Sequence, residues 1–220
     1  MRSGLLKKIL WGLAIVLNAC ALTLVFNYAP LEVTMGRVQK IFYYHVPSAI
    51  TAYILLAVAF IFSVLYLWKE KNSFDVIAHC VVEVAWVFMT VVITTGPIWG
   101  RAAWGAWWVW EPRLTSFLIL WLMYSAYLLV RLFGGRETGT AKIAAVVAVI
   151  AFIDVPIVHM AIKWWGSVVH PPHVELAHPM KVTFAVSTLA VFSLAAAMTV
   201  TRSSLGLARM REKKDGGDGR

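Results

Sequence analysis

The sequence is poor in cysteine and in charge, and each shortage excludes a class of protein. Only two cysteines occur among the 220 residues, Cys20 and Cys80, and they form neither a Cys-x-x-Cys pair nor a Cys-x-x-Cys-His haem attachment site. A disulfide-rich secreted module and a c-type cytochrome are therefore excluded. Charged residues make up 14% of the chain and hydrophobic residues 60%. Soluble domains have about 25% charged residues and roughly 45–50% apolar residues. This excludes a water-soluble enzyme and a disordered chain.

Motifs for nucleotide binding and nucleophilic catalysis are also missing. The glycine-containing stretch 134–142 has neither the Gly-Lys-Ser/Thr ending of a phosphate-binding loop nor a strand before it. No Gly-x-Ser-x-Gly nucleophile motif occurs. We therefore expect a protein that is not an enzyme and not an ATPase, so that any energy it uses comes from a partner.

Six long apolar stretches dominate what is present. An 18-residue stretch forms a helix about 27 Å long, enough to cross the hydrocarbon core, and none alternates as barrel strands do. We expect an all-α polytopic membrane protein, a bundle of six transmembrane helices forming one domain over residues 1–220. The first stretch is too long for the apolar part of a cleaved signal peptide and is expected to be retained. The expected spans are 9–26, 50–68, 76–98, 114–130, 143–160 and 182–201.

The basic residues predict the orientation of these spans. The net charge is +9, and the positive-inside rule accounts for it without nucleic acid, through cytoplasmic loops and lipid headgroups. Fourteen basic residues lie at the N-terminus, in the second and fourth connections and in a basic tail at 202–220, and six lie in the other three connections. Both termini are therefore expected in the cytoplasm. The six outward residues are Arg37, Lys40, Arg101, Arg113, Lys163 and Lys181.

The outward connections collect tryptophan. An aromatic belt would spread tryptophan over both membrane interfaces, but seven of the 11 lie on this side: Trp99, Trp104, Trp107, Trp108, Trp110, Trp164 and Trp165. If the segment 98–113 is helical, Trp104, Trp107 and Trp108 share one face with Glu111 and form an indole shelf. Pro112 suits the first turn of the fourth span. Together with Arg101 and Arg113, the shelf suits a large, planar, anionic ligand.

Two histidines flank this aromatic segment. His45 lies just before the second span, and His170 follows the Trp164-Trp165 pair. Haem iron accepts imidazole as an axial ligand, and one histidine from each side would give a six-coordinate site. The residues alone therefore support haem as a hypothesis, with polar interface histidines as the alternative.

The run from Trp104 to Thr115 resembles the tryptophan-rich "WWD" signature of haem-handling proteins in cytochrome c maturation. With Tyr44-His45-Val46-Pro47 before it, and Pro156-Ile157-Val158-His159 and Trp164-Trp165 after it, the chain is identified as a member of the CcmC family. The resemblance extends from about Lys40 to Lys181 and includes the number of spans.

The resemblance implies a function and a set of site residues. His45 and His170 would be the axial ligands of a non-covalently bound haem b, and Arg113 and Lys40 would lie near its propionates. The haem platform would consist of Trp104, Trp107, Trp108, Trp110 and Glu111. The haem would be presented at the periplasmic face of the bacterial inner membrane to the chaperone CcmE, with the CcmA–CcmB transporter and CcmD as further partners.

Two departures from the family pattern affect these assignments. The acidic residue of the signature is usually Asp, and here it is Glu111, which is one methylene longer. The interval from the tryptophan pair to the histidine is one residue longer than expected, so His173 is the alternative to His170.

Two other functions remain as alternatives. A b-type cytochrome anchor of a quinone-linked redox complex would use paired histidines within the bundle, and His79 and His159 are a poor pair for this because they are expected near opposite membrane surfaces. A transporter with a midplane site would show broken spans in repeated halves. His79 and Glu83, four residues apart, are expected to form a structural pair, and Pro156 is expected to kink the fifth span beside Asp154.

Overall fold

The protein is a bundle of helices that cross the membrane six times. The computed structural model describes residues 2–134, 138–167, 169–170 and 175–217, and six of its helical segments are long and apolar enough to span a membrane. This confirms the all-α polytopic fold. The α-helices are α1 (Arg2–Thr23), α2 (Phe42–Lys69), α3 (Asn72–Trp104), α4 (Pro112–Phe133), α5 (Thr138–Phe152), α6 (Asp154–Trp165) and α7 (His178–Gly217); a π-helical turn η1 (Leu24–Tyr28) and a 3₁₀ turn η2 (Arg37–Ile41) join α1 to α2.

Several helices extend beyond the apolar stretches that predict them. Helix α7 continues to Gly217, so the first part of the expected tail, including Arg202, belongs to the sixth span's helix. The fifth span is divided between α5 and α6. Pro156 lacks an N–H group, and in a continuous helix its ring would clash with the carbonyl of Phe152. The chain turns at Ile153, whose amide donates to the Ile150 carbonyl over 3.1 Å rather than to a carbonyl four residues back. The expected kink is thus a break in the helix.

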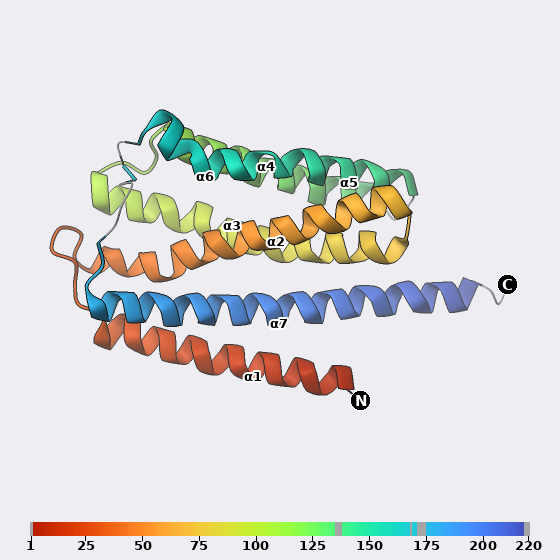
Figure 1. Ribbon diagram of the computed structural model, residues 1–220, viewed down its shortest axis with the longest axis horizontal. Coiled ribbons are helices and arrows are strands. Elements are labelled where there is room, and N and C mark those ends of the chain that lie inside the picture. Colours follow the sequence, from red (N-terminus) through yellow and green to blue (C-terminus); the bar gives the residue numbers. More distant parts are fainter. Residues whose placement is uncertain (1, 135–137, 168, 171–174, 218–220) are drawn as a thin grey trace.

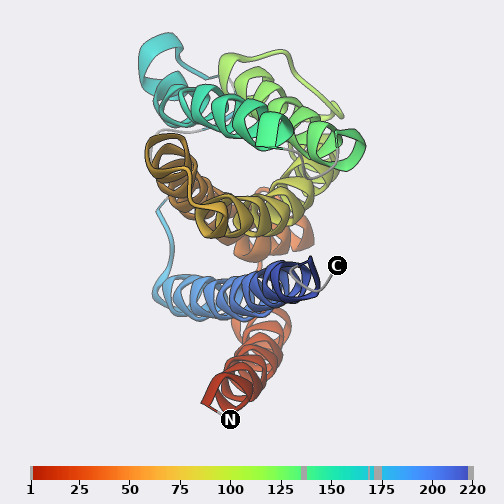
Figure 2. The same ribbon diagram turned by 90° about the vertical axis from the view of Figure 1, so that its right-hand side faces the viewer.

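The helices pack in layers, which are visible in Figures 1 and 2. Helix α1 lies outermost and packs against α7, α7 packs against the middle tier of α2 and α3, and α4 with α5 and α6 forms the layer on the other side. The connections α1–α2, α3–α4 and α6–α7 lie at one end of the bundle, opposite the start of α1 and the end of α7 (Figure 1). The start of α2, which carries His45, therefore lies at the same end as the α3–α4 and α6–α7 connections.

The middle tier forms the core. Alanines on α2, among them Ala52 and Ala59, are fully buried with Val82 and Ala85 of α3, because small side chains let helices approach closely in a membrane. The buried Tyr124 of α4 donates a hydrogen bond to the Ala148 carbonyl of α5 over 3.2 Å. This bond satisfies a hydroxyl that would be costly to leave unpaired in an apolar interior.

At the opposite end of the bundle, acidic residues on one face of α3 anchor its neighbours. Asp75 accepts two parallel hydrogen bonds of 2.9 Å from the guanidinium of Arg131 on α4. Glu83, two turns further along, pairs with Arg202 of α7 at 2.8 Å and with His79 at 3.5 Å. The expected His79–Glu83 pair is therefore present, and an arginine from another helix completes it.

Removing Asp75 should destabilise the bundle strongly. The side chains of Arg131 and Asp75 are only 7% and 13% exposed, and breaking a buried pair from one side typically costs about 3–5 kcal/mol. We expect Asp75→Ala to lower the thermal unfolding midpoint in detergent, and Asp75→Asn combined with Arg131→Gln to recover part of the loss.

Glu70→Ala is the matched control. Glu70 pairs with Lys142 at 2.6 Å, but these side chains are 64% and 46% exposed, and exposed pairs contribute little. Equal midpoints for Asp75→Ala and Glu70→Ala would show that the buried pair does not hold α3 to α4.

Candidate functional site

The tryptophan-rich segment is not a continuous helix. Helix α3 ends at Trp104, and Gly105 adopts a left-handed conformation with φ 79°, which side chains with a Cβ rarely adopt. The guanidinium of Arg101 bonds the Gly105 carbonyl, and residues 106–111 are not helical. The expectation of one helical indole shelf is therefore wrong, because the left-handed glycine ends α3 before Trp107.

Glu111 joins this segment to the histidine-bearing connection. It precedes Pro112, the first residue of α4, as the proline's preference for a first turn predicts. Its carboxylate, 5% exposed, accepts a hydrogen bond from Nδ1 of His170 at 2.5 Å and one from the Ser167 hydroxyl at 2.5 Å. Since a carboxylate only accepts hydrogen bonds, Nδ1 of His170 carries a hydrogen, and in the neutral imidazole Nε2 carries the lone pair.

A hydroxyl fixes the second histidine in the same way. Nδ1 of His45, on α2, lies 2.8 Å from Oγ1 of Thr95 on α3. Thr95 donates its own hydrogen to the Val91 carbonyl over 2.6 Å, so its oxygen accepts from His45. The Nε2 lone pair of His45 is therefore free, and neither Nε2 has a hydrogen-bond partner among the residues that the structure describes.

The two imidazoles line one narrow aromatic cavity of about 30 Å³. This is far smaller than typical small-molecule sites, which occupy roughly 300–1,000 Å³, so only part of a large ligand could enter it unless the lining moves. Trp99 packs edge-on against His45 with ring centroids 5.6 Å apart, and Trp104 lies 6.2 Å from His170. The lining consists of His45, Gly96, Pro97, Trp99, Trp104, Trp107, Trp108, Leu114 and His170.

Two indole N–H groups in the lining lack an acceptor. Nε1 of Trp104 and Nε1 of Trp108 are buried without a hydrogen-bond partner in the described part of the chain. Gly100 allows the Trp104 position, because a Cβ there would lie 2.7 Å from the indole. Buried donors are usually satisfied, so these two groups fit a ligand that brings acceptor oxygens to an aromatic cavity.

Three other residues implied by the resemblance, Arg113, Trp110 and Lys40, are not part of the cavity lining. Arg113, in the first turn of α4, has no carboxylate partner in the described residues, and its charge contributes to the lowered pKa of His170. Trp110 is 76% exposed and packs edge-on against Trp108 outside the lining.

Lys40 donates to the Phe26 carbonyl over 3.1 Å and covers the Phe26 ring, so its ammonium is bound to η1. The alternative ligand, His173, lies outside the described residues.

The sequence alone does not single out three residues of this site. Thr95 and Ser167 are hydroxyl residues without any motif, and only the fold brings them to the histidines. Trp99 is one of the outward tryptophans, but its contact with His45 depends on how α2 packs against α3. One signal could have suggested this contact: Trp99 lies three residues after Gly96, on the same face of α3, and Gly96 also lies beside His45.

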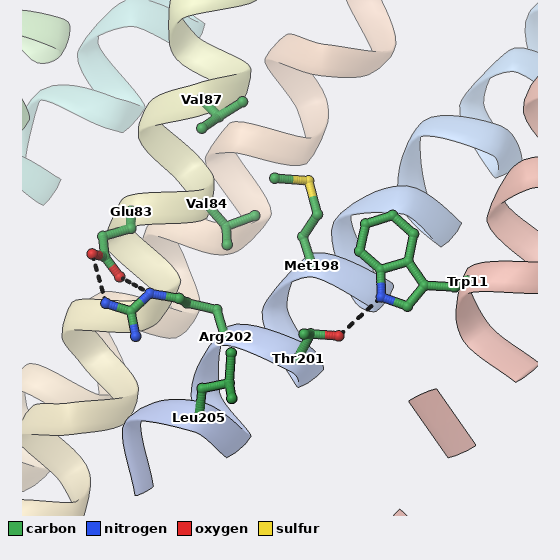
Figure 3. A pocket seen from close by; sticks show the side chains of 8 residues that line it. All are labelled: Trp11, Glu83, Val84, Val87, Met198, Thr201, Arg202 and Leu205. Carbon is green, nitrogen blue, oxygen red and sulfur yellow. Dashed lines mark hydrogen bonds and ion pairs between the residues drawn. The ribbon is translucent and has the colours of Figure 1, made fainter. Parts of the chain in front are cut away.

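A second cavity, of about 330 Å³, lies between α1, α3 and α7 and offers no comparable chemistry. Figure 3 shows its apolar lining, including Met198 and Leu205, with the Glu83–Arg202 pair at one edge. Trp11 donates to the Thr201 hydroxyl over 3.0 Å. These polar groups satisfy one another, and no histidine lines the cavity.

Burial and Glu111 act in opposite directions on His170. Burial lowers the pKa of His170 below 6.5, and the bond to Glu111 partly offsets this. We therefore expect His170 to be neutral at pH 7, with its hydrogen on Nδ1, in ¹⁵N NMR spectra of histidine-labelled protein. In Glu111→Gln the pKa should fall further, because the carboxylate no longer stabilises the imidazolium. A rise of the His170 pKa in that variant would contradict this electrostatic account.

Comparison with known proteins identifies the family. The family model described as heme exporter protein C (CcmC) matches residues 2–215. A ccmC-like mitochondrial protein of cytochrome c biosynthesis from Marchantia polymorpha is 30% identical over 168 residues, which cover 76% of this chain and 71% of that protein. Heme exporter protein C of Haemophilus influenzae is 34% identical over 164 residues, covering 72% of this chain and 59% of that protein.

Heme exporter protein C of Escherichia coli K12 is 32% identical over 146 residues, covering 64% of this chain and 58% of that protein. The matched regions thus span less than two thirds of these two bacterial proteins. The match of the family model extends over nearly the whole chain. The chain belongs to the heme exporter protein C family.

Proposed function

We propose that this protein binds haem b non-covalently at the periplasmic face of the bacterial inner membrane and delivers it to the chaperone CcmE during cytochrome c maturation. The observation that carries this proposal is the pair of imidazoles on one aromatic cavity. Each has its Nδ1 hydrogen bonded and its Nε2 free. Membership of the heme exporter protein C family indicates that the ligand is haem. The absence of a Cys-x-x-Cys-His motif favours non-covalent binding.

The geometry supports His45 and His170 as the two axial ligands. Metal-ligating histidines usually donate the second ring N–H to a carboxylate, carbonyl or other acceptor, which orients the ring. Thr95 and Glu111 fill this role here. The ligands come from α2 and from the α6–α7 connection, so a porphyrin between them would touch the α3–α4 connection as well.

The tryptophans would provide the platform for the porphyrin. The cavity is small, and Trp107 on its rim is 62% exposed, so the macrocycle would be only partly enclosed. Arg113 and the unpaired N–H groups of Trp104 and Trp108 suit the propionate oxygens. Trp110 extends the aromatic surface outward. Lys40, which is bonded to Phe26, would have to turn away from η1 to reach a propionate.

Partial enclosure supports transfer rather than storage. An exposed porphyrin edge would be accessible to CcmE, while CcmA–CcmB and CcmD would supply the energy and the remaining contacts of the complex. The cavity lies at the end of the bundle that carries six basic residues rather than fourteen, which supports the periplasmic side and cytoplasmic termini. In this role the protein moves its ligand and catalyses no reaction of its own.

Replacing a ligand and replacing the platform should have different consequences. In His45→Ala or His170→Ala, haem should bind more weakly with a changed absorption spectrum, and added imidazole should restore six-coordination. In Trp107→Ala/Trp108→Ala, stacking worth roughly 0.5–1.5 kcal/mol per aromatic pair is lost, and imidazole should not restore haem retention. Acid–acetone should extract the haem from the wild type.

Three results would contradict this proposal. Colour that remains on the denatured wild-type chain would exclude non-covalent binding. Imidazole rescue of His173→Ala, with His170→Ala behaving as wild type, would move the ligand to His173. Unchanged spectra in all three histidine variants would place the ligands elsewhere.

The orientation has its own test. Single cysteines introduced at Lys163 or Lys181 in a Cys20→Ser/Cys80→Ser background should react with a membrane-impermeant reagent in intact cells. A cysteine at Lys142 should react only after lysis, because the fourteen-to-six distribution of basic residues puts that connection inside. Labelling of the Lys142 position in intact cells would reverse the topology and remove the site from the periplasmic face.

A further inference from the structure

We propose that the two histidines hold haem unequally: His170 is the anchored ligand, and His45 is the ligand that leaves when haem is handed on. Ser167 and Thr95 are positioning residues in this arrangement, each acting through the histidine beside it. The inference rests on the proposed function and goes beyond it by assigning an order of release.

His170 is held by a charged partner. Its Nδ1–H donates to the buried Glu111 carboxylate at 2.5 Å, and charge-assisted bonds are roughly twice as strong as neutral ones. The negative charge also makes Nε2 a stronger donor towards a metal. Ser167 fixes both ends of this contact, because its hydroxyl donates to Glu111 and accepts the His170 amide hydrogen over 2.7 Å.

His45 is held by a neutral partner that is already engaged. Its Nδ1–H donates to the Thr95 hydroxyl at 2.8 Å, and that hydroxyl donates its own hydrogen to the Val91 carbonyl. No carboxylate contacts His45 in the described part of the chain. The Nε2 of His45 is therefore the weaker donor of the two, although its ring is well packed against Trp99.

The difference predicts which side of the haem opens first. When an incoming ligand competes for the iron, the bond to His45 should break and the bond to His170 should remain. The sixth position then becomes available on the side of α2 and α3. A haem acceptor that brings its own ligand would enter there, while Glu111 and Ser167 keep the haem in place from the other side.

Carbon monoxide is a suitable probe, because it displaces one axial ligand of ferrous haem. The haem-loaded full chain is reduced, exposed to CO and photolysed, and resonance Raman spectroscopy records the iron–histidine stretch of the ligand that stays. In the wild type this stretch should have the high frequency of a histidine bonded to a carboxylate. Glu111→Gln should lower it, and Ser167→Ala should lower it less, with Ser167→Thr restoring it.

Variants at Thr95 form the matched control. Thr95→Val removes the acceptor of His45 and should leave the stretch unchanged, because His45 is then absent from the iron. Glu111→Gln should weaken haem binding about 10- to 100-fold, the usual effect of losing such a partner, and Thr95→Val less than about tenfold, with Thr95→Ser restoring it.

The outcomes separate this inference from the proposed function. A stretch that responds to Thr95→Val and not to Glu111→Gln would show that His170 leaves first and would overturn the inference, while haem binding by two histidines stands. A stretch unaffected by either variant would overturn it equally. A wild-type chain that binds no haem would instead refute the proposed function.

Discussion

The site depends on one buried carboxylate. Glu111 stands at the junction of the tryptophan-rich connection and α4, and it binds Ser167 and His170 of the α6–α7 connection. Among the described residues, these two bonds are the polar links between the α6–α7 and α3–α4 connections. A buried carboxylate is costly unless it is hydrogen bonded, and here both of its oxygens have partners. The same contact that ties two connections together also fixes the tautomer of His170.

The membrane setting explains why the site forms at the end of the bundle. Irregular backbone is not tolerated where lipid surrounds it, because its polar groups would be unsatisfied. The left-handed Gly105, the non-helical residues 106–111 and His170 all lie in connections outside the spans. The helices supply the rigid part, with His45 and Thr95 facing each other across the α2–α3 contact.

The sequence predicts the architecture well, because long apolar runs determine where a chain crosses a membrane. It also predicts the first-turn position of Pro112 and the family, through local signals. It does not predict that Gly105 ends α3, since a single glycine is compatible with a helix. Thr95, Ser167 and Arg202 act through partners far away in sequence, and no local pattern shows such contacts. The resemblance also implied a propionate contact for Lys40, but in this structure the Lys40 ammonium binds the Phe26 carbonyl.

The arrangement gives less support to a quinone-linked cytochrome. His79 is paired with Glu83, and His159 is exposed on α6, so these two do not present a pair of ligands within the bundle. The break between α5 and α6 beside Asp154 is the one feature a midplane transporter would share. It has no counterpart in a second half of the described chain.

The most direct measurement is a cryo-electron microscopy map of the haem-loaded protein at a resolution that shows side chains. The account predicts iron between Nε2 of His45 and Nε2 of His170, with Nδ1 of each ring still bonded to Thr95 and Glu111. Haem bound away from this cavity, or iron ligated through an Nδ1 atom, would contradict it.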